Sequence, residues 1–121
     1  MKVAVTAVGN DLDAEVDPRF GRAPYFLIVE TDDMSFEALV NEAAEASGGA
    51  GPAAAQAVAD AGAQVVLTGN CGPNAHRTLE AAGIKVFVGV EGIAREAVER
   101  YLRGEYGEAP GPNVKGGFGS K

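Results

Sequence analysis

Two consecutive segments of this chain follow one plan, and this repeat restricts the possible folds more than any other feature. The first segment begins with Gly51-Pro52 and the second with Gly72-Pro73, 21 residues later, and each reaches an Ala-Gly pair before a β-branched stretch. Proline in the first turn and glycine after the last are typical of a helix. The repeat therefore predicts helices over 52–61 and 73–82 and strands over 64–68 and 84–90. Strands that are separated by helices pair in parallel through right-handed crossovers.

The first forty residues contain three apolar stretches without such a repeat. Residues 2–8 form a continuous run typical of a central strand, and 25–30 and 35–41 are joined by a short turn that favours an antiparallel hairpin. The alternative, a helix over 35–46, would be cut short by the glycines that follow. With an amphipathic helix over 92–103, the element order becomes β-β-β-α-β-α-β-α. We predict a ribonuclease-H-like α/β fold, a five-stranded mixed sheet with helices on its faces; a flavodoxin-like fold is the alternative.

Length and charge limit the class of protein further. The chain has 121 residues, enough for one domain, which we expect over 1–103, followed by a flexible tail rich in glycine and proline over 104–121. The net charge is −7 and no basic stripe is present, so nucleic acids and anionic membranes are poor partners. A single cysteine, no signal-peptide pattern and no apolar segment of membrane-spanning length favour the cytoplasm.

Glycine-rich turns follow the predicted parallel strands, at 7–10, 68–72 and 89–92. In open α/β sheets, ligands bind beyond the carboxyl ends of the strands, so these turns should share one binding edge. The loop 11–24 leaves the same edge and should bring Arg19 and Arg22 opposite the start of the second repeat helix. Backbone N–H groups and the helix dipole favour anions at such a start, so we expect an anionic ligand there.

The loop before that helix holds the only cysteine of the chain, Cys71, and the helix holds the only histidine, His76. The helix dipole should favour the thiolate of Cys71, and the two residues together suit zinc, copper(I) or iron–sulfur centres. Two ligands do not complete a metal site, so a third ligand or the inorganic atoms of a cluster would be needed. The alternative is a small buried cysteine and a surface histidine.

Enzymatic chemistry is poorly supported by the residues. A ribonuclease-H-like nuclease needs a carboxylate in the middle of its first strand to hold magnesium, and the strand over 2–8 offers only valine, alanine and threonine there. The alternating acids of 11–17 do not follow the calcium-loop pattern, because position six is Val16 and position twelve is Arg22. A hydrolase built on Cys71 and His76 would need a third, orienting residue, and nothing singles one out. We therefore expect a binding protein and no enzyme.

Two motifs resemble a known family. Asp17-Pro18-Arg19-Phe20-Gly21-Arg22-Ala23-Pro24-Tyr25-Phe26 and Thr68-Gly69-Asn70-Cys71-Gly72-Pro73-Asn74-Ala75 are similar to the dinitrogenase iron–molybdenum cofactor binding and biosynthesis family, the NifX/NifB-like domain, over nearly the whole chain up to about Arg103. The resemblance implies a ribonuclease-H-like fold without nuclease activity. It also implies binding or carriage of iron–sulfur-type metalloclusters, including the iron–molybdenum cofactor or its precursors, in nitrogenase assembly, with cluster-assembly proteins as possible partners.

The chain departs from the family pattern at three positions. Many members have histidine where Arg19 stands, an aliphatic residue at position 71 and an aromatic residue at position 76, so Cys71 and His76 lie outside the shared motif. The residues expected to bind the cargo, an iron–sulfur or iron–molybdenum type cluster, are Asn10, Arg19, Phe20, Gly21, Arg22, Gly69, Asn70, Gly72, Pro73 and Asn74, with Cys71 and His76 as candidate metal ligands. The alternative function is a regulatory module that binds a small anion or a protein partner without metal.

Overall fold

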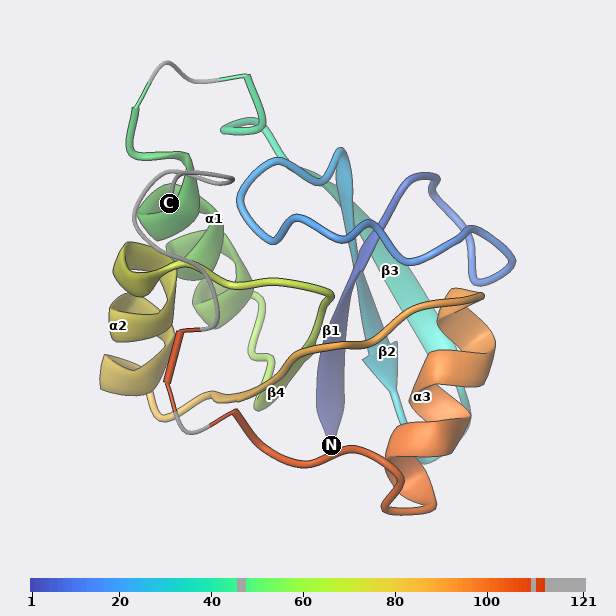
Figure 1. Cartoon of the computed structure of the whole chain (residues 1–121). Coiled ribbons are helices and arrows are strands. Elements are labelled where there is room, and N and C mark those ends of the chain that lie inside the picture. Colours follow the sequence, from blue (N-terminus) through green and yellow to red (C-terminus); the bar gives the residue numbers. More distant parts are fainter. Residues whose placement is uncertain (46–47, 110, 113–121) are drawn as a thin grey trace.

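The predicted order of strands and helices is confirmed by the computed structural model, which describes residues 1–45, 48–109 and 111–112 (Figure 1). The strands are β1 (Lys2–Ala7), β2 (Tyr25–Glu30), β3 (Ser35–Val40), β4 (Val65–Leu67) and β5 (Lys85–Phe87). The helices are α1 (Ala50–Asp60), α2 (Pro73–Ala81) and α3 (Ala94–Leu102). The strands form the predicted five-stranded mixed sheet, and their order across it is β3-β2-β1-β4-β5. The ribonuclease-H-like designation stays a prediction.

The hairpin of β2 and β3 is antiparallel, so the strand interpretation of 35–41 is confirmed over the helical alternative. Its turn is closed by a hydrogen bond from the Met34 amide to the Glu30 carbonyl (2.8 Å). Met34 has a φ of 60°, in the left-handed region, and the carboxylate of Asp33 accepts a hydrogen bond from the Ser35 amide (2.9 Å). A local aspartate turn therefore reverses the chain where the sequence offered only short polar residues.

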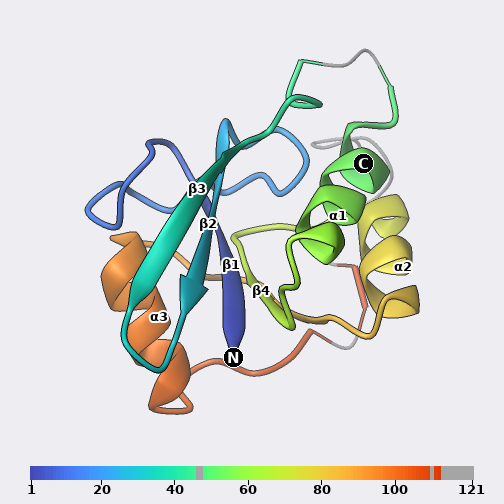
Figure 2. The same ribbon diagram turned by 180° about the vertical axis from the view of Figure 1, so that it is seen from behind.

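The repeat produces the parallel half of the sheet and one of its two helical layers. β1 pairs in parallel with β4, and β4 in parallel with β5. Figures 1 and 2 show α1 and α2 side by side over one face of the sheet and α3 over the other. The core is divided accordingly, with Ala54, Val58 and Leu79 buried on the first face and Ala97 and Val98 on the second.

The elements differ from the predicted ones mainly at their ends. α1 begins at Ala50, two residues before the predicted start, so Gly51 lies inside α1 whereas its repeat counterpart Gly72 precedes α2. Beyond α3, the Ala109 amide donates to the Val86 carbonyl (2.8 Å), which lays 108–109 along β5. The predicted flexible tail therefore begins with a stretch that is packed on the sheet, and 110 and 113–121 lie outside the described residues. No helix of the described part is long and apolar enough to cross a membrane.

Candidate functional site

The loop 11–24 is fastened to the edge of the sheet in two separate halves. Its first half is bound to the start of α3, because the amides of Ala94 and Arg95 donate to the carbonyls of Ala14 and Leu12 (both 2.9 Å). The Val16 amide donates to the Gly92 carbonyl (2.8 Å). The exposed Asn10 lies in the turn that leads into this first half. The second half, from Asp17 onward, is bound elsewhere and carries four of the predicted binding residues, Arg19, Phe20, Gly21 and Arg22.

Buried hydroxyl groups anchor that second half to the ends of β1 and β4. The Thr6 hydroxyl donates to the Asp17 carbonyl (2.7 Å) and is hydrogen-bonded to the Thr68 hydroxyl (2.9 Å). The Asp17 amide returns a hydrogen bond to the Thr6 carbonyl (2.9 Å). Both threonines are buried, and each such satisfied buried hydrogen bond contributes about 0.5–1.5 kcal/mol. The loop is therefore fixed at its root and is not a lid that swings over the edge.

The segment 18–20 then runs beside 69–70 in contact with its backbone. The Phe20 amide donates to the Asn70 carbonyl (3.2 Å), and the side-chain amide of Asn70 donates to the Pro18 carbonyl (3.1 Å). A methyl group on Gly69 would lie 2.7 Å from the Cα of Pro18, so only glycine permits this approach. The ring of Phe20 is buried against that of Phe26, with centroids 5.4 Å apart. Gly69 therefore permits the close approach of the two segments, and the buried ring of Phe20 anchors the segment 18–20 to the core.

Gly21 continues this path to the start of α1. A methyl group on Gly21 would lie 3.1 Å from both the Cα and the amide nitrogen of Gly51. A methyl group on Gly51 would in turn lie 3.1 Å from the Cβ of Ala75, in the first turn of α2. The starts of α1 and α2 therefore lie next to each other, and Gly21 lies against the first of them. Figure 1 shows the two helices running side by side from this end.

In the part of the chain that the structure describes, neither helix start is capped by a side chain. The residues at the N-caps are Gly49 and Gly72, and proline follows in the first turn of each helix. The first N–H groups of a helix have no acceptor within the helix, so uncapped starts offer donors to a ligand. Because the two helices begin side by side and run in the same direction, the positive ends of their dipoles favour negative charge at one place. Gly72 and Pro73 are half-buried there, and Asn74 is exposed.

The two arginines of the loop are held in different ways. The Arg19 guanidinium donates from two nitrogens to the two oxygens of the Asp17 carboxylate (both 3.3 Å), and that carboxylate is buried and also accepts the Arg19 amide (2.9 Å). Arg22 donates to the Ala44 carbonyl (2.9 Å) and is half-buried. The charge of Arg19 is thus shared with the Asp17 carboxylate. The guanidinium of Arg22 reaches toward 42–45, and the placement of both arginines opposite the start of α2 stays a prediction.

Cys71 is buried among apolar side chains, and burial raises the pKa of its thiol to about 12. The expectation that the helix dipole would favour the thiolate is therefore wrong, because loss of water outweighs the dipole at this position. The thiol instead lies 3.8 Å from the Gly72 carbonyl. His76 is also buried, so the alternative of a surface histidine is wrong as well. Among the residues that the structure describes, no group of three His, Cys, Asp or Glu side chains is arranged to hold a metal ion.

The structure thus brings together Arg19, Phe20, Gly21, Gly69 and Asn70 and places Gly72–Asn74 at the neighbouring helix start. Asn10 belongs to the other half of the loop. The start of α1, Ala50-Gly51, lines the candidate site and was not among the residues predicted from the sequence. The signal available was the repeat itself, since Gly51-Pro52 matches Gly72-Pro73, and two helices built on one plan and packed in parallel begin at the same end.

The architecture, a mixed sheet with a pinned loop over paired helix starts, is that of a small ligand-binding α/β domain. The chain belongs to the dinitrogenase iron-molybdenum cofactor family, whose model matches residues 1–104. This confirms the resemblance seen in the two motifs.

Three relatives illustrate the membership. The apo form of the orange protein from Desulfovibrio gigas is 49% identical, covers 93% of this chain and 95% of its own, and superposes with a TM-score of 0.90. A Thermotoga protein described as a candidate NifB protein is 37% identical over 88% of this chain and 91% of its own, with a TM-score of 0.78. An uncharacterised protein from Methanocaldococcus jannaschii is 29% identical over 87% of this chain and 88% of its own.

Proposed function

We propose that this protein binds and carries an anionic iron–sulfur-type metallocluster, the iron–molybdenum cofactor or a related precursor, as an accessory to cluster assembly in the cytoplasm and without catalysing a reaction itself. The observation that carries the proposal is the adjacency of two uncapped helix starts, those of α1 and α2, beneath the pinned segment 19–22. Family membership supports a cofactor-binding or carrier role. The orange protein and the candidate NifB protein fit the same role.

Metalloclusters of this kind carry negative charge and expose sulfur atoms that accept hydrogen bonds. The N–H groups at the starts of α1 and α2 supply the donors, and the dipoles of both helices favour the charge. Arg19 and Arg22 add guanidinium groups on the loop side, where the Asp17 carboxylate orients the first of them. Glycine at 21, 51 and 72 keeps the backbone accessible, since a side chain there would cover the amides.

Cys71 and His76 are the proposed metal ligands, and their burial defines what ligation requires. A thiol whose pKa is near 12 is protonated at neutral pH, so it binds metal only if the metal displaces the proton and the loop 69–72 opens. Recognition by backbone amides and arginines needs neither step. We infer that the amides and arginines make the first contact and that ligation by the two side chains follows.

Anaerobic reconstitution with iron and sulfide, followed by visible absorption after desalting, tests the proposal. Retention of a chromophore at a fixed ratio to protein is expected, and it should weaken in Arg19→Gln. The matched control is Arg95→Gln, because Arg95 is equally exposed (46% against 45%) and also paired with an aspartate, but on α3. No retained chromophore, or equal loss in both variants, would contradict cluster binding at this edge.

The roles of the two candidate ligands are separated by Cys71→Ala and His76→Ala. Unchanged absorption in both variants would show that the cluster is held without them. The metal-free alternative, a regulatory module for small anions, predicts instead that phosphate or sulfate binds after thorough chelation. Calorimetric titration of the chelated protein with each anion measures that binding, and its dependence on Arg19 would favour the alternative.

A further inference from the structure

The strand β3 forms an open edge of the sheet, while the opposite edge is short and covered. β5 has only three residues, and the stretch 108–109 lies along it. β3 has six residues, and within the described part of the chain it pairs with β2 alone (Figure 2). It contains no proline and no lysine, and Glu37 is its single charge. Edge strands of monomers are normally blocked by such devices, so β3 has the character of a pairing surface.

The hydrogen bonds of the hairpin determine which residues of β3 face outward. The Asn41 amide donates to the Pro24 carbonyl (2.9 Å), so this pair lies in a hydrogen-bonded position of the ladder. Because such positions alternate in an antiparallel pair, residues 35, 37 and 39 direct their backbone groups to β2. The N–H and carbonyl groups of Phe36, Ala38 and Val40 therefore point away from the sheet. They make a row of three donors and three acceptors along the open edge.

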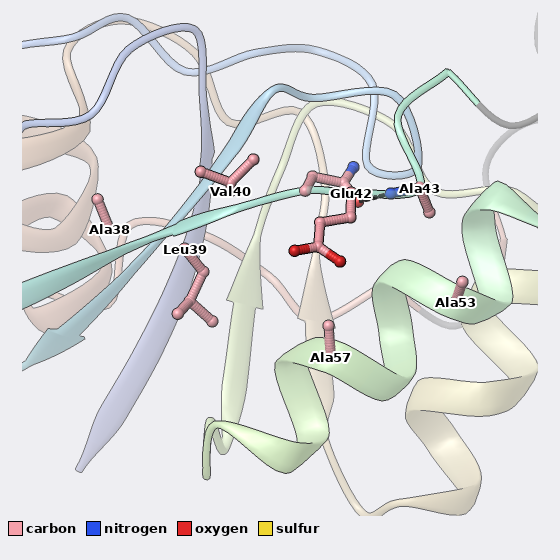
Figure 3. Close-up of a pocket in the computed structure, with 8 residues that line it drawn as sticks. Ala38, Leu39, Val40, Glu42, Ala43, Ala53 and Ala57 are labelled. Carbon is pink, nitrogen blue, oxygen red and sulfur yellow. Dashed lines mark hydrogen bonds between the residues drawn. The ribbon is translucent and has the colours of Figure 1, made fainter.

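The same outward set carries exposed apolar side chains. Phe36 is 42% exposed and Val40 66% exposed, and alternation along the strand places both on the face of the sheet opposite to Leu39. Figure 3 shows Val40 and Leu39 on opposite sides of β3, with Leu39 directed toward α1. On that second side a groove of about 580 Å³ separates β3 from α1, lined by Leu39, Ala53 and Ala57 among others. Within the described part of the chain, Phe36 and Val40 are therefore exposed on one side of the edge and the groove lies open on the other.

We propose that β3 pairs with β3 of a second copy of this chain, antiparallel about a two-fold axis through Ala38, to give a continuous ten-stranded sheet. In this register the outward backbone groups of Phe36 meet those of Val40 in the partner, and those of Ala38 meet their own equivalents. Three residues of each copy therefore form a complete set of ladder hydrogen bonds. Phe36 also comes directly opposite Val40, an aromatic and β-branched pair of the kind that stabilises sheets.

Two neighbouring registers also match outward groups, and charge and pairing exclude both. An axis through Glu37 would place two glutamates directly opposite each other, which is destabilising. An axis through Leu39 would place Phe36 beyond the partner's strand and opposite its Glu42. The axis through Ala38 instead sets Glu37 against Leu39. It is the register in which no like charges face each other and all outward residues are paired.

The size and charge of the interface make this a weak association. A single pair of six-residue strands buries far less than the ~800 Å² per partner of a standard stable interface, so we expect a dissociation constant of about 0.1–1 mM. Each copy carries a net charge of −7, and the two copies therefore repel each other. Salt screens that repulsion, so association should strengthen at higher ionic strength.

Sedimentation velocity over a concentration series up to about 1 mM, in 0.05 M and 0.5 M salt, tests the proposal. A dimer is expected at the upper end, and more of it at high salt. Val40→Lys should raise the dissociation constant about tenfold or more by placing a charge opposite the partner's Phe36 in the interface. Leu102→Lys is the matched control, because Leu102 is 49% exposed on α3 and receives the same charge. A protein that stays monomeric throughout, or equal weakening in both variants, would overturn the proposal.

Cross-linking then tests the register. Ala38→Cys in a Cys71→Ala background places equivalent thiols across the axis, where hydrogen-bonded partners have Cα atoms about 5.5 Å apart, within disulfide range. Mild oxidation should convert this variant to a covalent dimer faster than Glu37→Cys or Leu39→Cys in the same background. Faster cross-linking of either flanking variant would place the axis elsewhere and overturn the assigned register.

Discussion

The contact between Gly69 and Pro18 provides a direct test of how the site is built. In Gly69→Ala the new methyl group would lie 2.7 Å from the Cα, 3.0 Å from the carbonyl oxygen and 3.1 Å from the Cβ of Pro18. Two of these three atoms belong to the backbone, so no side-chain rotation relieves the overlap. The segment 18–20 must move away from the end of β4, which strains the hydrogen bonds from Asn70 to Pro18 and from Phe20 to Asn70.

The expected cost is that of overpacking a closed contact, about 1–3 kcal/mol in the free energy of unfolding. For a domain of this length, each kcal/mol lowers the melting temperature by about 3–6 °C, so a decrease of about 3–18 °C is expected. Cargo retention should fall as well, because Arg19 and Gly21 move with the displaced segment. Thermal unfolding followed by circular dichroism and the reconstitution assay measure the two effects separately.

Gly107→Ala is the matched control for this substitution. A methyl group on Gly107 meets nothing within 4 Å, and its φ lies outside the left-handed region, so both stability and retention should be unchanged. If Gly69→Ala melts at the same temperature as Gly107→Ala, the close contact does not exist in solution. If it melts lower but retains the cargo fully, the segment 18–20 is structural and lies outside the binding site.

Three further substitutions test other parts of the argument. Gly51→Ala should change the free energy of unfolding by less than about 1 kcal/mol, because the gain in helix propensity offsets the 3.1 Å contact with the Cβ of Ala75. It should nevertheless reduce cargo retention, because the new methyl group covers the Ala75 amide, 3.6 Å away. Full retention would remove the start of α1 from the site. Burial holds the pKa of Cys71 near 12 against a usual 9.0, so above pH 9 the thiol ionises in the unfolded chain but not in the folded one. The protein should therefore lose about 1.4 kcal/mol in the free energy of unfolding between pH 8 and pH 10, relative to Cys71→Ala, as measured by denaturant titration. An identical pH profile in that variant would contradict the burial. Asp17→Ala should lower the free energy of unfolding by about 1–3 kcal/mol, because it removes a buried acceptor of charged hydrogen bonds. Asp13 is an exposed partner of Arg95, so Asp13→Ala should cost under about 0.5 kcal/mol in the same chemical unfolding experiment. Equal costs would mean that the pair of Arg19 and Asp17 is solvated.

The parallel half of the fold could be predicted because its signals are local. Proline in the first turn, glycine after the last and β-branched residues beyond determine each helix–strand unit, and the repeat at 21 residues states the plan twice. The hairpin was predictable for a similar reason, since the polar turn between β2 and β3 leaves too few residues for any crossover. The start of α1 was missed by two residues because Gly49, with a φ of 73°, ends the preceding turn earlier than the proline indicated.

The contacts that assemble the site were not predictable, because they join residues far apart in the chain. The Thr6 hydroxyl meets Asp17 and Thr68, and the backbone of Gly21 meets that of Gly51. Nothing in the pattern near either residue indicates its partner. The burial of Cys71 has the same origin, since it belongs to a core cluster that also includes Phe20 of the loop and Ala54 and Val58 of α1.

Distinctive side chains are also easier to find in a sequence than the backbone groups that make the first contact in a site of the kind we propose. Cysteine and histidine are chemically distinctive, so Cys71 and His76 stand out in a sequence, although both are buried. A backbone amide is common to every residue and leaves no mark of its own. What a sequence records instead is the absence of side chains around such amides, as at Gly51 and Gly72, and the proline that starts each helix without a cap. In a family that binds its cargo through helix starts, the glycine and proline positions should therefore predict the site better than any potential metal ligand.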